Sequence, residues 1–406
     1  MNKKKNRENY RILGFRFVLL AAVVLSVNAC VTSQHAVVTG EDTIKKQESV
    51  FMRPQAANVT FSWMQLPADV DIRSFSVFKL SSNGKILIGN ASLKDETQAS
   101  SIKPLQAFRW NLADNQWLWL DNLKYENGAA LMGMDSTGDR VFGAQWVWQK
   151  NAPEIKALNQ NFWAYILRDD GYFIGAGLNS SIMMISMDGS VQKSWPVEDV
   201  LRLDNRGNLE DTLLFSDSGT VISSTMEQCL QDNDCEQATL TRWTPEQGSS
   251  ALPVQIPERP EAFFQSHAGP QLVSQNGKWL AGSVGQGIYL WDVQGQMKFL
   301  GAFDNGGTVV SLSNDGKMAV GYTTGNQSKL ARSWIWTETE GLGWLDEWLR
   351  NHGVAAENIS KIMQVQLLSP DRRVMIGFTP PEDTLDSQAQ SHWWKVDLSE
   401  HLRVLI

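Results

Sequence analysis

Residues 313–321 read Ser-Asn-Asp-Gly-Lys-Met-Ala-Val-Gly, in which a turn signal is followed by a strand signal. Asn-Gly and Asp-Gly favour the positive φ angles of a tight β-hairpin turn, and alternating apolar residues on both sides are typical of strands. Closely similar phrases recur along the chain, so each predicts a β-hairpin. The copies are residues 80–89, 135–143, 168–175, 216–223, 274–282, 313–321 and 369–377, and the last has Arg372 in place of the turn glycine.

A tryptophan-rich third strand follows most of these hairpins, and a fourth apolar strand often comes next. Residues 58–406 therefore divide into seven units of about 50 residues with four strands each. This predicts an all-β fold, a seven-bladed β-propeller with four antiparallel strands per blade; eight blades or a β-sandwich are the alternatives. Third strands are expected at 107–110, 240–243, 288–291, 332–336 and 392–394, and fourth strands at 117–120, 297–300 and 342–345.

A closed ring needs its first and last blades joined. Residues 59–64 precede the first hairpin and resemble the fourth strands, so we expect them to complete the last blade; residues 402–406 are the alternative. Most of the 17 tryptophans fall on third and fourth strands, which indicates packing between blades rather than sugar stacking. Trp146, Trp148 and Trp195 follow the period least.

The repeated phrase resembles the HAF-type extracellular repeats of exported bacterial β-proteins. The best copy is residues 305–321 followed by 333–336, and Ala107-Phe108-Arg109 echoes the His-Ala-Phe signature, with Gln106 at the histidine position. The resemblance covers most of residues 70–400. It implies an exported β-rich repeat protein and carries over neither an activity nor a catalytic residue.

The first residues predict export. Residues 1–29 hold a basic segment and then an apolar run at 17–27, too short for the roughly 20 apolar residues that span a bilayer, so a signal peptide is favoured over a membrane helix. The sequence from Val27 to Cys30 resembles a bacterial lipobox, which implies lipid attachment at Cys30. Val31 after it implies an outer-membrane lipoprotein of the cell envelope in a Gram-negative source. Residues 30–57 are then a tether, and residues 58–406 the propeller.

Export also bears on the other two cysteines, Cys229 and Cys235. A disulfide between them is the default in an oxidising compartment, and no CxxC or neighbouring histidine favours a metal instead. The five histidines show no metal-binding spacing, so neither a metal nor another cofactor is expected. A net charge of −8, with residues 1–29 net positive, makes nucleic acid a poor partner.

Acidic residues follow several fourth strands, and we expect them on one face of the ring. They could form an acidic surface that attracts a basic partner, or they could simply be turn formers. The candidates are Asp69, Asp121, Asp199, Glu258, Asp304 and Asp346.

No catalytic residue stands out. Residues 281–285 approximate a nucleophile elbow, but they fall on a repeat strand rather than on a strand-to-helix turn. The leading hypothesis is therefore a lipid-anchored, non-enzymatic binding or scaffold module for an envelope protein or glycan. The alternative is a polysaccharide hydrolase or lyase with two carboxylates converging at the channel mouth.

Overall fold

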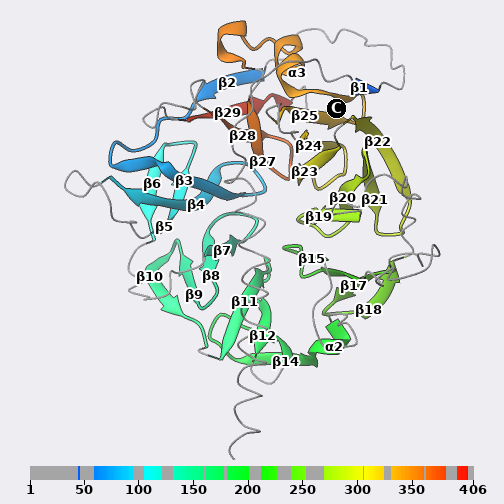
Figure 1. Ribbon diagram of the computed structural model, residues 1–406. Coiled ribbons are helices and arrows are strands. Elements are labelled where there is room, and N and C mark those ends of the chain that lie inside the picture. Colours follow the sequence, from blue (N-terminus) through cyan, green and yellow to red (C-terminus); the bar gives the residue numbers. More distant parts are fainter. Residues whose placement is uncertain are drawn as a thin grey trace, which may run out of the picture.

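The computed structural model of the chain is a ring of seven antiparallel sheets around a common centre (Figure 1). The structure describes residues 44–45, 59–94, 105–120, 131–159, 161–177, 181–200, 212–225, 239–252, 269–304, 306–323, 331–360, 363–380 and 391–400. Each sheet is one blade, so the predicted seven-bladed β-propeller is confirmed.

The first four blades each consist of four strands that are consecutive in the sequence. Blade 1 is β3 (Val70–Leu80), β4 (Ile86–Leu93), β5 (Gln106–Asn111) and β6 (Gln116–Trp119). Blade 2 is β7 (Leu131–Met134), β8 (Arg140–Gly143), β9 (Trp146–Gln149) and β10 (Ala152–Ala157). Blade 3 is β11 (Phe162–Leu167), β12 (Phe173–Gly177), β13 (Ser181–Ile185) and β14 (Val191–Pro196), and blade 4 is β15 (Thr212–Phe215), β16 (Val221–Thr225), β17 (Thr239–Thr244) and β18 (Gly248–Leu252).

The last three blades include the closure of the ring. Blade 5 is β19 (Gly269–Val273), β20 (Trp279–Val284), β21 (Gly287–Asp292) and β22 (Met297–Phe303), with the short β1 (Ile44–Lys45) added at its edge. Blade 6 is β23 (Gly307–Leu312), β24 (Met318–Thr323), β25 (Ser333–Thr337) and β26 (Gly341–Trp344). Blade 7 is β27 (Gln364–Leu368), β28 (Val374–Thr379) and β29 (His392–Leu398), completed by β2 (Val59–Trp63) as its fourth strand.

The N-terminal strand closes the ring, as expected from the sequence. Strand β2 pairs along its whole length with β29, from Val59 opposite Leu398 to Trp63 opposite Trp394. Phe61 of β2 also stacks on Trp394, with ring centroids 6.3 Å apart. Residues close to the two ends of the chain therefore share one sheet.

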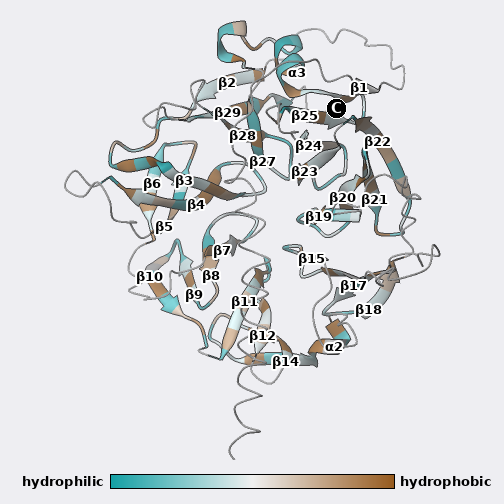
Figure 2. Cartoon of the chain, in the orientation of Figure 1, coloured by the Kyte–Doolittle hydropathy of each residue, from teal (hydrophilic) through white to brown (hydrophobic). Residues whose placement is uncertain are grey.

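The core consists of seven apolar layers, one between each pair of neighbouring blades. This follows from the strand period, because alternate side chains point to opposite faces of a sheet. Figure 2 shows hydrophobic residues along the strands of the blades. Large rings fill these layers, as the sequence predicted for the tryptophans of the third strands. Those buried are Trp110, Trp243, Trp291, Trp334, Trp336, Trp393 and Trp394.

Two tryptophans follow the repeat more closely than their spacing indicated. Trp146 and Trp148 lie buried on β9, the third strand of blade 2, and pack against blade 1. Their place in the repeat was hidden because blade 2 has short connections. Trp195 on β14 is half-buried and meets Trp243 of blade 4 edge to face, with centroids 5.0 Å apart.

The hairpin turns explain the recurring serine and asparagine or aspartate. In blade 6, the hydroxyl of Ser313 donates to the carboxylate of Asp315 and accepts the backbone N–H of Met318. The same pair of bonds recurs around Ser81, Ser274 and Ser369. Each serine is fully buried, so the turn satisfies its own polar groups.

Each turn also packs on the preceding blade. A Cβ at Gly316 would lie 2.4 Å from Trp279 of blade 5, and one at Gly84 would lie 2.6 Å from Val374 of blade 7. Both glycines have positive φ angles, 68° and 69°. In blade 7, Arg372 takes the glycine position at φ 63° and reaches back to Asp315 of blade 6, 2.9 Å away.

The two faces of the ring differ in their connections. Turns from first to second strand and from third to fourth strand lie on one face, called here the turn face. Connections from second to third strand and from one blade to the next lie on the opposite face, the connection face. Helical segments lie between blades: α2 (Val197–Val200), α3 (Leu345–Asn351) and η1 (Ala356–Asn358). No helix among the described residues is long and apolar enough to cross a membrane.

Candidate functional site

The acidic residues expected on the connection face are spread around the ring rather than gathered. Asp69, Asp199 and Asp304 are exposed, and each stands beside a different blade. Asp121 and Glu258 lie outside the described residues. The three described carboxylates thus form no shared pocket with one another, and the acidic surface stays a prediction.

Asp346 differs from these three, because it is buried and balanced by positive charge. Its side chain is only 3% exposed. Arg332 donates to both of its oxygens at 2.7 and 2.9 Å, and Arg350 donates to Oδ2 at 2.7 Å. Arg332 also lies over the ring of Trp344. Asp346 therefore anchors the start of α3 and adds little negative charge to the surface.

A polar network crosses the ring at its turn face. Lys79 of blade 1 contacts the carboxylate of Asp217 in blade 4, and its ammonium group also donates to the carbonyl of Met134, 3.1 Å away. Beside them, the Ser82 hydroxyl donates to Oε1 of Gln275 in blade 5 at 3.0 Å. The first strand of blade 1 carries a β-bulge between Val77 and Lys79. Bulges change the direction of neighbouring side chains, and this one directly precedes Lys79.

The surroundings of Asp217 shift the pKa of its carboxyl group. Burial raises the pKa of Asp217 above its usual value, whereas the ammonium group of Lys79 opposes that rise. Asp135 and Asp169 add to the rise in the pKa of Asp217. Both of these acids are engaged in turns: Arg140 donates to Asp135 at 2.6 Å, and the N–H of Ser136 donates to Asp169 at 2.9 Å.

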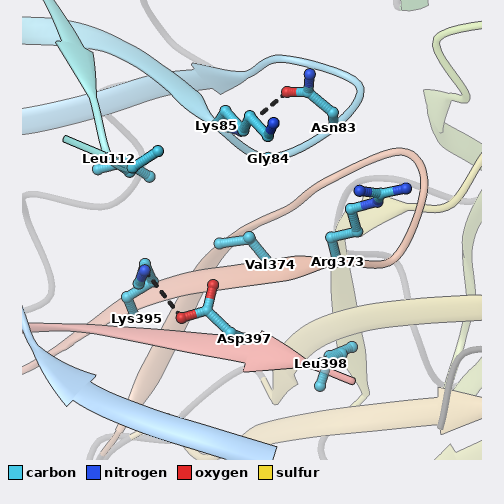
Figure 3. Close-up of a pocket in the computed structure, with 10 residues that line it drawn as sticks. Asn83, Gly84, Lys85, Leu112, Arg373, Val374, Lys395, Asp397 and Leu398 are labelled. Atoms are coloured by element: carbon cyan, nitrogen blue, oxygen red, sulfur yellow. Dashed lines mark hydrogen bonds and ion pairs between the residues drawn. The ribbon is translucent and has the colours of Figure 1, made fainter. Parts of the chain in front are cut away.

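A concave pocket lies on the turn face between blades 7 and 1 (Figure 3). It encloses about 300 Å³, the lower end of the range for small-molecule sites. This pocket is called the closure groove, because it lies where the ring closes. Its wall is formed by the hairpin turns of both blades and by the end of β29. It is lined by Asn83, Gly84, Lys85, Leu112, Ala113, Arg373, Val374, Lys395, Asp397 and Leu398.

The closure groove combines an apolar floor with a basic rim. Lys395 and Asp397 stand two residues apart on β29, so both project from the same face of the sheet. Their Nζ and Oδ2 atoms lie 2.8 Å apart. Lys85 and Arg373 occupy the same position in their hairpins, directly after the turn residue, and both are exposed. Three cationic groups and one carboxylate therefore line the groove.

The lipid-attachment site and the disulfide expected from the sequence stay predictions. Cys30, Cys229 and Cys235 lie outside the described residues. Within the described part of the chain, no cluster of three or more metal-ligating side chains occurs.

The sequence analysis missed both the cross-ring network and the closure groove. The recurring position after the turn residue was a usable signal, since it is basic in blades 5, 6, 7 and 1: Lys278, Lys317, Arg373 and Lys85. Only the closed ring brings Lys85 and Arg373 together, because their hairpins stand in the first and last blades.

Comparison with known proteins finds similar folds among solved structures. A manganese-bound oligogalacturonate lyase has a TM-score of 0.48 at 11% identity, covering 85% of this chain and 98% of its own. The oligogalacturonate lyase of Vibrio parahaemolyticus gives 0.49 at 12%, covering 85% and 98%. A catalytically inactive virginiamycin B lyase from Staphylococcus aureus with quinupristin gives 0.47 at 12%, covering 84% and 100%. No family model and no curated protein sequence matches the chain. The likeness concerns the fold, and it bears on no activity.

Proposed function

We propose that this chain is an exported, lipid-anchored β-propeller of the cell envelope that binds a protein or glycan without converting it. The lipobox-like segment ending at Cys30 supports the anchor, and the HAF-like repeats support export. In this proposal Cys30 carries the lipid. The segment expected from the sequence to be a tether links it to the ring, except that Ile44 and Lys45 within it pair with β22 at the edge of blade 5.

The observation that carries the binding role is the dispersal of the candidate carboxylates that the structure describes. Glycosidic hydrolysis needs two carboxyl groups about 5–9.5 Å apart across a cleft. Asp69, Asp199 and Asp304 stand beside different blades, and the closure groove holds one carboxylate, Asp397. The carboxylates that do approach one another near Asp217 are engaged by Lys79, Arg140 and turn N–H groups. A rigid ring with such a surface suits recognition.

The anchor is tested by metabolic labelling with an alkyne analogue of palmitate in a Gram-negative host. We expect the full chain to be labelled and to fractionate with the outer membrane, and the Cys30→Ser variant to lose both properties. Cys229→Ser is the matched control and should keep the label. Label retained by Cys30→Ser, or an intact Met1 on the purified protein, would contradict the proposal.

The binding role is tested with the soluble chain that begins after residue 30. Envelope polysaccharide and envelope protein extracts are offered separately, and both retention and product formation are followed over time. We expect saturable retention with no new reducing ends and no unsaturated sugar products. Steady accumulation of either product would favour the hydrolase or lyase alternative instead.

A further inference from the structure

The closure groove differs in charge from the chain as a whole. The chain has a net charge of −8, yet the groove is lined by Lys85, Arg373 and Lys395 against one lining acid, Asp397, with Asp371 beside Arg373, which leaves one cation in excess. Cations gathered in a concavity focus a positive potential there. A ligand for this site should therefore carry negative charge.

The cationic side chains at the rim have hydrogen-bond donors that no described residue accepts. Asp397 takes one of the three hydrogens of the Lys395 ammonium group. Asp371 contacts Nε of Arg373 at 2.5 Å, and among the described residues neither terminal nitrogen of that guanidinium has a hydrogen-bond partner. Among the described residues, Lys85 has no acidic partner.

Asn83 adds a neutral donor at the same rim. Its Oδ1 accepts the Ser81 hydroxyl at 2.9 Å and the N–H of Lys85 at 3.0 Å. The turn occupies this oxygen, and among the described residues no hydrogen bond engages the amide nitrogen of Asn83. It can donate to a hydroxyl or carboxylate of a bound molecule.

The floor of the groove is apolar and close to the backbone. Val374 and Leu398 are buried, and Leu112 is half-buried. Gly84 belongs to this floor because a Cβ there would lie 2.6 Å from Val374. A bare inorganic ion would leave this surface uncovered, whereas a compact organic body would bury it.

We propose that the closure groove binds a small sugar-like anion, with its carboxylate or phosphate against Arg373 and Lys395 and its ring over Val374 and Leu112. Uronic acids and sugar phosphates share this chemistry. The inference goes beyond the proposed envelope function and does not depend on the lipid anchor, since it rests on the groove alone.

The test is isothermal titration of the soluble chain with D-glucuronate, glucose 6-phosphate, glucose and inorganic phosphate. Ligands of this size in small pockets bind with a Kd of about 1 mM. We expect saturable binding of D-glucuronate, of glucose 6-phosphate, or of both, which identifies the source of the anion. Glucose and inorganic phosphate should bind at least about tenfold more weakly, because each lacks one half of the contacts.

Variants of the groove separate recognition from stability. Arg373→Met and Lys395→Met should each weaken binding about tenfold, the loss of one charged hydrogen bond. Lys278→Met is the matched control, because Lys278 occupies the same turn position in blade 5, away from the groove. Asp397→Asn should strengthen binding severalfold by removing the competing carboxylate. Thermal unfolding of each variant checks that the fold is kept.

Several results would overturn this inference. They are the absence of saturable binding of both acidic sugars, equal affinity for glucose, equal affinity for inorganic phosphate, or unchanged affinity in the folded Arg373→Met/Lys395→Met double variant. None of them bears on lipid labelling at Cys30 or on retention of envelope material by the chain.

Discussion

The ammonium group of Lys79 in blade 1 contacts the carboxylate of Asp217 in blade 4, so that one ion pair bridges the ring. Both side chains are less than one-fifth exposed, at 18% and 19%. Oδ2 of Asp217 is buried and has no hydrogen-bond partner among the described residues. Such a pair is sensitive to the loss of either member, because the remaining charge is left without compensation.

Replacing Lys79 should therefore destabilise the protein in a pH-dependent way. Burial raises the pKa of Asp217, and removal of the opposing ammonium group raises it further above the unfolded value. A raised folded pKa gives stability that is present at acid pH and is lost as pH rises through that pKa. We expect Lys79→Met to lose about 3 kcal/mol of unfolding free energy near pH 7 and less near pH 4.5, measured by urea unfolding.

The control removes both charges together. Lys79→Met/Asp217→Leu removes both members of the pair, so that neither charge is left without its partner; most of the lost stability should return and the added pH dependence should disappear. A double variant as unstable as Lys79→Met at neutral pH would show that packing, rather than the orphaned carboxylate, causes the loss.

Two glycines of blade 6, Gly321 on β24 and Gly343 on β26, test how closely the backbones of neighbouring strands approach. A Cβ at Gly321 would lie 2.0 Å from the carbonyl oxygen of Thr308, whereas a Cβ at Gly343 in the same blade meets nothing within 4 Å. We expect Gly321→Ala to reduce the free energy of unfolding by about 2 kcal/mol or more. Gly343→Ala should stay within about 0.5 kcal/mol of the parent. Similar denaturant midpoints for the two variants would contradict the described register of blade 6.

Arg372 tests the role of the positive φ angle in the seventh hairpin. Its left-handed backbone is unfavourable for a side chain by about 1–2 kcal/mol, and glycine relieves this strain. Both Arg372→Gly and Arg372→Ala remove the contact with Asp315. We therefore expect the glycine variant to be more stable than the alanine variant by about 1 kcal/mol, measured by chemical unfolding. Equal stabilities would rule out backbone strain at this position.

Ring closure can be tested by truncation at the N-terminus. A chain beginning at residue 58 keeps β2, whereas one beginning at residue 66 exposes the edge of β29. Unpaired strand edges promote association between chains. We expect the longer chain to be monomeric and the shorter one to aggregate or dimerise in light scattering. A monomeric shorter chain with unchanged unfolding would mean that β2 contributes nothing to closure.

The architecture could be read from the sequence because its signal is local and repeated. The turn around Gly316 and the strand from Ser333 to Thr337 each follow from neighbouring residues, and seven copies reinforce one another. The position of β2 was predictable as well, because the last blade needs a fourth strand to close the ring and residues 59–64 resemble the other fourth strands. The short connections of blade 2 disguised Trp146 and Trp148, because there the spacing departs from the average.

The candidate site was less accessible to sequence analysis. Lys85 and Arg373 are remote in the sequence, and only closure of the ring makes them neighbours. Asp346 was instead expected in a site that it does not form, because its position after a fourth strand indicated an exposed acid. Arg332 lies directly before β25 and Arg350 lies one helical turn further along α3, and both pair with Asp346, so that the charge of Asp346 is neutralised in a buried setting.

Pairing of β2 with β29 has a consequence for how the molecule is made. Val59 is synthesised long before Leu398, yet the two are partners in one ladder. The seventh blade therefore cannot assemble until β29 has emerged from the ribosome, although its partner β2 emerges before any other blade is complete.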